Sequence, residues 1–329
     1  MLATYEVLTT DMVTDGRETF AAEVAAGLSS SPKQLSSKWF YDARGSDLFE
    51  RIIESPEYYL TGCESEILRR HRGHIAELAG DEPFRLIELG VGDGRKTRPL
   101  LQTLVERESE FTYVPVDICE ATVSDLTNRL TIAFGPDFPV RGIVAEYMEA
   151  ISKIDEAPSQ RTVVLFLGSN IGNFNIGESV EFLSGLRRGL REGDHALIGF
   201  DLKKEISVLE AAYNDSAGLT AEFNFNLLTR MNRELDANFK RKHFVHHGRY
   251  NVRYSRMESW LVARHAHIVT IGALGRDVYF DPWEGIHVEN SQKYDVADIE
   301  AIAEASGFEV VENLFDSRGY FCDSIWRAV

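Results

Sequence analysis

The sequence is poor in cysteine, in basic residues and in long apolar runs, and each shortage argues against a class of protein. Only three cysteines occur in 329 residues, so we expect a reducing cytoplasm and neither a disulfide framework nor a zinc site. Lys and Arg number 35 against 52 Asp and Glu. The net charge of −17 disfavours nucleic acid partners. No apolar run approaches the roughly 20 residues of a membrane helix, and no secretory signal is visible at the N-terminus.

The densest basic segment covers residues 240–249 and contains His243, His246 and His247. No acidic or cysteine ligand accompanies these histidines at suitable spacing, so the sequence predicts no metal site. We interpret the segment as a solvated helix end and turn. The remaining composition, 44% hydrophobic and 26% charged, is typical of a soluble globular protein with room for two domains.

A glycine-rich turn is the most informative motif. The apolar run 86–89 is followed by Gly90, Gly92 and Gly94, and then by a helix-like stretch over 96–105. Strand, tight turn and helix in this order present a nucleotide site at the carboxyl end of a strand. The spacing G-x-G-x-G, with Glu88 two residues before it, favours S-adenosylmethionine over NAD. Taken alone, the motif also fits an ordinary glycine-rich turn.

Further strands and helices alternate after this turn. The predicted strands cover 111–117, 140–144, 162–167 and 196–201, and helices cover 121–133 and 179–191. Asp117 ends the second strand, where a carboxylate accepts hydrogen bonds from ribose hydroxyls. Glu146 and Tyr147 follow the third strand, where adenine is expected. The alternation predicts an α/β fold with a doubly wound, mostly parallel sheet.

The pattern changes after residue 202. Residues 203–240 are helical in pattern, and 250–294 alternate as strands. A helix over 296–306 and two strands then return to the sheet. We therefore predict a cofactor-binding domain over 62–202 and 295–329. A second, discontinuous α+β domain, over 1–61 and 203–294, is predicted to bind the substrate.

Five segments together resemble a known family, the histidine-specific, S-adenosylmethionine-dependent Nα-methyltransferases. They are residues 38–46, 56–61, 166–174, 212–224 and 289–294, in the family's order along the chain. The resemblance implies a class I, Rossmann-like methyltransferase fold that binds S-adenosylmethionine and releases S-adenosylhomocysteine. The residues expected to hold the cofactor are Glu88, Gly90, Gly92, Gly94, Lys96, Asp117, Glu146 and Tyr147. Those expected around the amino acid are Tyr41, Tyr58, Asn173, Tyr213, Ser259, Glu289 and Ser291.

The resemblance also implies a reaction. The α-amino group of L-histidine is methylated, three times in the family, to hercynine for ergothioneine biosynthesis. Tyr41 and Tyr58 are the catalytic candidates, because a tyrosine hydroxyl can orient the amine and guide its proton to water. Glu289 and Ser291 are expected to read the imidazole. A carboxylate beside a hydroxyl accepts from an imidazole N–H and rejects side chains that lack one. We expect a monomer that needs no metal.

Alternatives remain at this point. Ser259 stands where the family usually has a bulkier methionine, so a wider pocket for tryptophan or another aromatic or modified amino acid stays open. Glu146 stands where a shorter aspartate is usual. A nicotinamide dehydrogenase fits the glycine spacing poorly. A binding protein that kept the fold but lost turnover is the remaining alternative. A test for production of S-adenosylhomocysteine would distinguish it from an enzyme.

Overall fold

A computed structural model describes residues 5–8, 16–155 and 160–329 and divides them into two compact units. The first unit holds residues 5–8, Leu60–Lys203 and Gln292–Val329, and the second holds residues 16–59 and Lys204–Ser291. The predicted division lies within a few residues of these bounds, with one exception. Residues 5–8 belong to the first unit, because their strand pairs with the sheet of that unit. Whether the second unit binds the substrate stays a prediction.

The first unit is built on an eight-stranded sheet, with the order β1-β5-β4-β3-β6-β7-β14-β13. The six strands from β1 to β7 in that order are parallel, while β14 and β13 are antiparallel to their neighbours. The bounds are Tyr5–Val7 (β1), Phe84–Leu89 (β3), Phe111–Asp117 (β4), Gly142–Val144 (β5), Arg161–Phe166 (β6), His195–Asp201 (β7), Phe308–Phe315 (β13) and Phe321–Ala328 (β14). The predicted α/β class with a mostly parallel sheet is confirmed.

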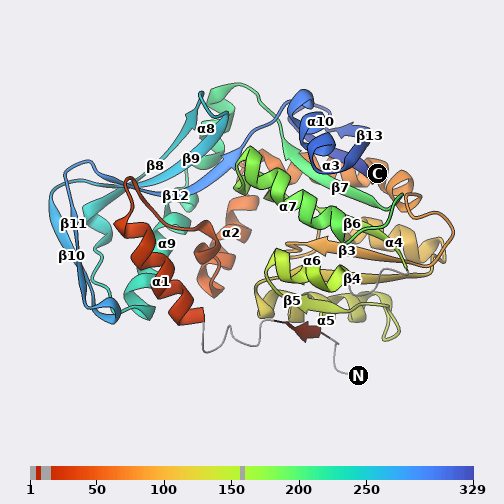
Figure 1. The fold of residues 1–329 in the computed structure, drawn as a ribbon, viewed down its shortest axis with the longest axis horizontal. Coiled ribbons are helices and arrows are strands. Elements are labelled where there is room, and N and C mark those ends of the chain that lie inside the picture. Colours follow the sequence, from red (N-terminus) through yellow and green to blue (C-terminus); the bar gives the residue numbers. More distant parts are fainter. Residues whose placement is uncertain (1–4, 9–15, 156–159) are drawn as a thin grey trace. The chain divides into compact units, whose positions relative to one another are not determined.

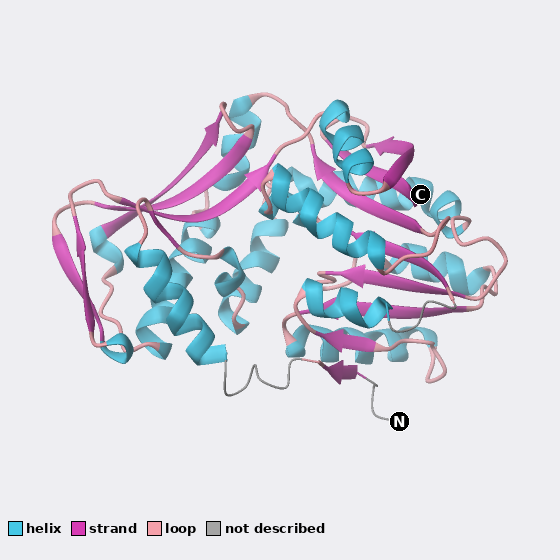
Figure 2. Ribbon diagram, in the orientation of Figure 1, coloured by secondary structure: helices cyan, strands magenta, loops and turns pink. Residues whose placement is uncertain are grey.

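Helices cover this sheet on both faces (Figures 1 and 2). They are α3 (Tyr59–Ala76), α4 (Arg98–Glu106), α5 (Glu120–Phe134), α6 (Tyr147–Asp155), α7 (Ile176–Arg188) and α10 (Val296–Ala305). Ile87 and Leu89 of β3 are buried in one core with α6, α7 and α10. Glu88, between them, faces the opposite side, where it meets Thr97 just before α4. Helix α7 begins earlier than predicted because Asn175 and Glu178 form a capping box.

The second unit is an α+β assembly, as predicted. Its helices are α1 (Gly16–Ser29), α2 (Ala43–Ile53), α8 (Ile206–Tyr213) and α9 (Leu219–Glu234). Its sheet has the order β2-β12-β9-β8, with bounds Lys33–Gln34, Gly285–Gln292, Arg256–Ala263 and Phe244–Asn251. A separate two-stranded ribbon joins β10 (His267–Ile271) to β11 (Arg276–Phe280). Short 3₁₀ turns lie at Ser37–Phe40 (η1), Arg241–His243 (η3) and Gly272–Leu274 (η4).

The interpretation of residues 240–249 as a helix end and turn is wrong. Only the turn η3 precedes Phe244, which begins strand β8. This strand pairs with β9 along its whole length, from Phe244 opposite Ala263 to Asn251 opposite Arg256. Phe244 and Gly248 are buried, and pairing over eight residues outweighs the local excess of charged and histidine side chains.

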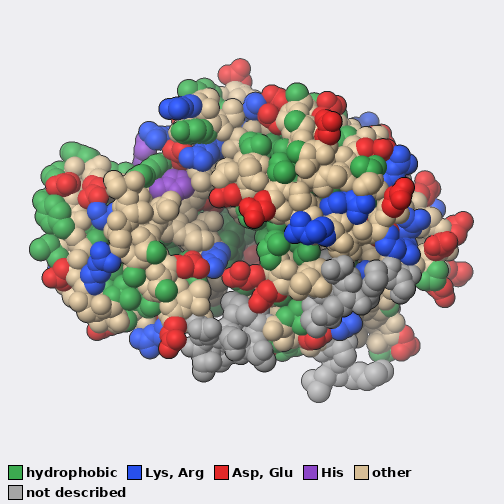
Figure 3. All heavy atoms as spheres, in the orientation of Figure 1, with side chains coloured by type: hydrophobic (Ala, Val, Ile, Leu, Met, Phe, Trp, Pro, Cys, Tyr) green, Lys and Arg blue, Asp and Glu red, His purple; other side chains and the backbone are tan. Residues whose placement is uncertain are grey.

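Among the residues that the structure describes, none of the helices combines the length and apolarity that crossing a membrane requires. Acidic and basic side chains are interspersed over the coloured part of the face in Figure 3. Cytoplasmic location, a monomeric state and the lack of a nucleic acid partner stay predictions.

Candidate active site

The turn after β3 has three glycines in the left-handed backbone conformation. Gly90, Gly92 and Gly94 have φ angles of +72°, +54° and +67°, the region that favours glycine. A Cβ on Gly90 would lie 2.5 Å from the Tyr147 hydroxyl, and one on Gly94 would lie 2.5 Å from Leu126. A Cβ on Gly92 would meet nothing within 4 Å. The turn is therefore packed at its two ends and leaves open space above its middle glycine.

Asp117 lies beside that open space. It ends β4, and its carboxylate accepts from the backbone N–H groups of Gly92, at 3.2 Å, and Cys119, at 3.0 Å. Burial raises the pKa of this carboxyl group, and the backbone donors oppose that rise by favouring the anion. The side chain is only half-buried. The structure thus brings the predicted ribose-binding carboxylate to the glycine turn.

Glu88, in the strand before the turn, joins the neighbouring segments by hydrogen bonds. Its side chain is buried, and its two oxygens accept from Thr97 at 2.7 Å and from Tyr113 at 2.6 Å. Burial raises the pKa of Glu88 to about 7, although both hydroxyl donors favour the charged form. These contacts fix β3 to β4 and to the start of α4. A direct contact of Glu88 with the cofactor stays a prediction.

Lys96 is held by a partner that the sequence did not indicate. Its ammonium group is paired with Glu64 of α3, and the other Glu64 oxygen accepts from the Gly168 N–H at 2.6 Å. Burial lowers the pKa of Lys96, but the nearby carboxyl groups, first Glu64 and then Glu88 and Asp323, more than offset this, and the net shift of the pKa is upward. Glu64 thus ties the lysine after the glycine turn to the end of β6. It lies 32 residues before Lys96, and no local pattern connects the two.

The ends of β5 and β6 bring further predicted residues to the same edge of the sheet. Tyr147 is the first residue of α6, and its ring packs against Phe166, with ring centroids 5.4 Å apart. Burial, together with the nearby Asp117 charge, raises the pKa of Tyr147, so its hydroxyl is neutral and can donate. Glu146 is exposed at the start of this helix. Both stand where adenine was expected.

The segment after β6 has an uncommon backbone. Gly168 and Ser169 both have left-handed φ angles, +75° and +55°, and for a serine this conformation is costly. It turns the chain into η2 (Asn170–Asn173). The Asn170 amide nitrogen lies 2.6 Å from where a Gly90 Cβ would be, and Asn173 is exposed at the far end of η2. Asn170 is a candidate that was not in the predicted set.

These residues fit the nucleoside part of a ligand. Open space above Gly92 admits a ligand against the backbone. The half-buried Asp117 offers acceptors for ribose hydroxyls, and Tyr147 offers an aromatic edge and a donor. S-adenosylmethionine has these groups, and when bound it supplies an electrophilic methyl group on sulfur.

In the second unit, two hydrogen-bonded pairs join the predicted amino-acid residues. Tyr213, at the end of α8, donates to Ser291 of β12 at 2.7 Å. Ser259 of β9 donates to Glu289 of β12 at 3.0 Å. Glu289 and Ser291 are two residues apart on one strand, so their side chains share a face of the sheet. Ser259 is opposite Gly248, which packs against the main chain of Tyr213. This sheet therefore brings together Ser259, Glu289 and Ser291, with Tyr213 of α8 bonded to them. Asn173, the other predicted polar residue, lies in η2 of the first unit.

Tyr41 and Tyr58 belong to an aromatic cluster in the same unit. Phe49 of α2 contacts both edge-on, with centroid distances of 5.7 Å to Tyr41 and 6.1 Å to Tyr58. Phe223 of α9 packs 5.4 Å from Tyr41. Such edge-to-face pairs hold the rings in fixed orientations. No spacing in the sequence indicated that Phe49 would join these two tyrosines.

A pocket of about 740 Å³ lies elsewhere in the second unit. It is lined by Asp215, Arg241 and His246, among others. The lining contains none of the predicted amino-acid residues, so we do not assign the substrate to it.

Comparison with known proteins gives a consistent result. A family model described as "Histidine-specific methyltransferase, SAM-dependent" matches residues 20–328. A histidine N-alpha-methyltransferase of Mycolicibacterium smegmatis is 38% identical over 92% of this chain and 93% of its own. The ergothioneine biosynthesis protein 1 of Schizosaccharomyces pombe is 27% identical over 84% of this chain and 37% of its own. An L-tryptophan methyltransferase of Psilocybe serbica is 25% identical over 92% of this chain and 90% of its own.

Proposed function

We propose that this chain, which belongs to the histidine-specific, S-adenosylmethionine-dependent methyltransferase family and is therefore an enzyme of that class, methylates the α-amino group of L-histidine. We further propose that it does so three times, to give hercynine for ergothioneine biosynthesis. The names of the M. smegmatis and S. pombe relatives support this substrate and this pathway.

The observation that carries the choice of histidine is the polar set on β12. Glu289 accepts from Ser259, and Ser291 accepts from Tyr213, so both side chains are held in place before a substrate binds. A carboxylate beside a hydroxyl matches the two nitrogens of an imidazole, one as donor and one as acceptor. A side chain without these nitrogens leaves the polar atoms unpaired, which costs about 1–3 kcal/mol per group.

The chain's own residues then act mainly by positioning. The amine nitrogen forms a bond to the methyl carbon, the carbon–sulfur bond breaks with its electron pair remaining on sulfur, and the amine proton leaves to water. Tyr41 and Tyr58 orient the amine, and their rings, fixed by Phe49, suit an ammonium that loses donors with each methyl group. Asn173 is proposed to hold the amino acid's polar atoms.

Tryptophan is the second candidate, and Ser259 is the reason. This serine is buried and is smaller than the methionine usual in the family, so we propose that the pocket beside Glu289 is wider here. The tryptophan-methylating relative from Psilocybe shows that the sequence similarity extends to that substrate class. An indole N–H can also donate to Glu289, but indole has no second nitrogen for Ser291.

The test is mass spectrometry of L-histidine and L-tryptophan incubated separately with the purified chain and S-adenosylmethionine. We expect histidine to gain one, two and three methyl groups in succession and tryptophan to stay unchanged. Glu289→Gln should lower turnover of histidine, whereas Glu205→Gln, at an exposed glutamate of the same unit, should not. Methylation of tryptophan alone would overturn the substrate assignment, and no S-adenosylhomocysteine from any amino acid would favour the binding-protein alternative.

A further inference from the structure

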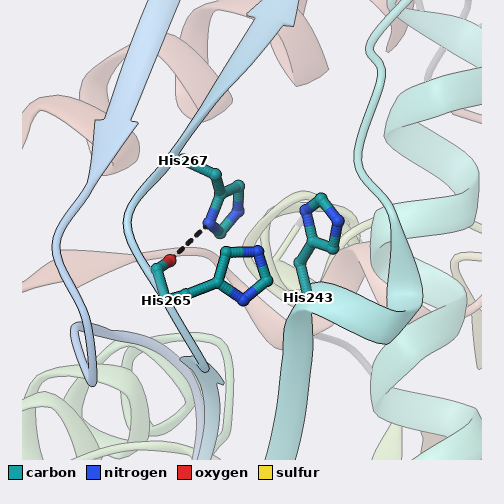
Figure 4. A group of neighbouring side chains, drawn as sticks. All are labelled: His243, His265 and His267. Atoms are coloured by element: carbon teal, nitrogen blue, oxygen red, sulfur yellow. Dashed lines mark hydrogen bonds between the residues drawn. The ribbon is translucent and has the colours of Figure 1, made fainter.

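Three histidines outside the proposed amino-acid set come together in the second unit. They are His243 at the end of η3, His265 between β9 and β10, and His267 at the start of β10. One ring nitrogen of each lies within 4.8 Å of the others. Figure 4 shows the three imidazoles pointing toward one another. Strand pairing causes this, because Phe244 is opposite Ala263 and the chain then enters β10.

His267 is prepared as a ligand. Its Nδ1 lies 2.8 Å from the backbone carbonyl oxygen of His265, the dashed line in Figure 4. A carbonyl can only accept, so Nδ1 carries the proton and Nε2 has a free lone pair. Metal-bound histidines commonly donate their other N–H to a backbone carbonyl, which fixes the tautomer and the ring.

That Nε2 has no hydrogen-bond partner among the described residues, although it is buried. Packing explains where the ring lies, since it stacks on Phe280 at 5.2 Å and contacts Phe244 edge-on at 5.0 Å. Packing does not explain a buried acceptor without a donor, which is costly. A bound metal ion that accepts the lone pair of Nε2 would remove this free-energy cost.

We propose that His243, His265 and His267 form a binding site for a zinc-like divalent transition metal ion, with solvent as the fourth ligand. Three neutral imidazoles suit zinc, copper and nickel. The set contains no carboxylate, which is the ligand that calcium and magnesium prefer. Zinc bound at about 2.0–2.1 Å to each nitrogen brings the nitrogens to roughly 3.3 Å apart. Small rotations of His243 and of the exposed His265 supply that contraction. Lys240 and Lys242 lie near His243, so their charge weakens the site.

The ion would have a structural effect. It would join η3 to the first strand of the β10–β11 ribbon, and an isolated two-stranded ribbon is only marginally stable. None of the three histidines belongs to the set proposed for methyl transfer, so this inference stands or falls separately from the proposed function.

The experiment uses the full chain without a histidine tag, stripped of metal and titrated with Zn²⁺ against a chromophoric chelator. We expect one zinc per chain. His265→Asn should weaken binding at least about tenfold, and it should not disturb folding because His265 is exposed. The matched control is His247→Asn, at an exposed histidine of β8, which should bind zinc like the unchanged chain.

A second readout separates loss of the site from misfolding. Cobalt bound to the unchanged chain should show the visible absorption of a tetrahedral site, and this should disappear in His243→Asn while the circular dichroism is retained. Absence of saturable zinc binding overturns the proposal. So does zinc binding that His265→Asn leaves unchanged, because the ion is then held elsewhere.

Discussion

The two units solve the problem of recognition by different means. In the first unit the candidate site is made largely by backbone: three glycines with positive φ, a left-handed Ser169, and N–H groups that point at Asp117. In the second unit it is made by side chains on a regular sheet, joined in the pairs Tyr213–Ser291 and Ser259–Glu289. Binding at the first site therefore depends on the backbone conformation of the turn. Binding at the second site depends on which hydrogen-bonding groups the side chains carry.

This difference predicts how each unit tolerates change. In the first unit an added methyl group is expected to do more harm than a changed charge, because the turn has no room for Cβ atoms at its ends. In the second unit, removing one hydroxyl or carboxylate is expected to alter the choice of substrate and leave the fold intact.

Gly90→Ala should reduce affinity for S-adenosylhomocysteine about thirtyfold or more, measured by calorimetry, because the turn must leave its present conformation to accommodate the Cβ. The left-handed conformation costs alanine about 1–2 kcal/mol, and contacts of 2.5 Å with Tyr147 and 2.6 Å with Asn170 add about 1–3 kcal/mol of overpacking.

Gly80→Ala is the control for this prediction. Gly80 has φ +70°, and a Cβ there meets nothing within 4 Å. Gly80→Ala should carry only the cost of the left-handed backbone conformation, which lowers the free energy of unfolding. Its affinity for S-adenosylhomocysteine should be unchanged. Equal losses of affinity in the two variants would show that contact with Tyr147 and Asn170 is unimportant.

Glu88 should make stability depend on pH. Its pKa is raised to about 7 in the folded chain from 4.5, so the folded state binds the proton more tightly than the unfolded state does. The associated stability is present below pH 4.5 and is lost as pH rises to 7, by about 3 kcal/mol. Glu88→Gln, which keeps the buried shape without the charge, should flatten this part of the profile in urea titrations at several pH values. An unchanged profile would contradict the assignment.

Ser259→Ala should produce the smallest effect. It removes one donor to Glu289, worth about 1 kcal/mol, so kcat/KM for histidine should fall roughly fivefold while affinity for S-adenosylhomocysteine stays the same. Ser207→Ala, at an exposed serine of α8 in the same unit, serves as the control. A rise in activity toward tryptophan in Ser259→Ala would support the wider-pocket alternative.

The sequence predicted the first unit well because its elements follow one another along the chain. Strand β4 was predicted with its observed bounds, and Asp117 lies at its end beside the glycine turn. What could not be predicted are contacts between distant segments. Glu64 of α3 pairs with Lys96 in the turn before α4, 32 residues along the chain, and neither residue carries a local signal of the other.

The second unit was predictable mainly through its resemblance to a family. Periodicity indicated strands over β9 to β12, but residues 244–251 were missed because histidines and arginines hid a strand that exists through pairing with β9. The joining of Tyr41 and Tyr58 by Phe49 depends on the packing of a loop against a helix. No spacing rule encodes such a contact.

The central claim is that the first unit holds the cofactor and the second unit selects the amino acid. The direct test is calorimetric titration of Asp117→Asn and Glu289→Gln with S-adenosylhomocysteine and, separately, with L-histidine. The account predicts a crossed result: Asp117→Asn loses about tenfold or more in affinity for S-adenosylhomocysteine and keeps its affinity for histidine, and Glu289→Gln does the reverse. If either variant weakens both ligands equally, or if Glu289→Gln binds histidine unchanged, the division of roles between the two units is wrong.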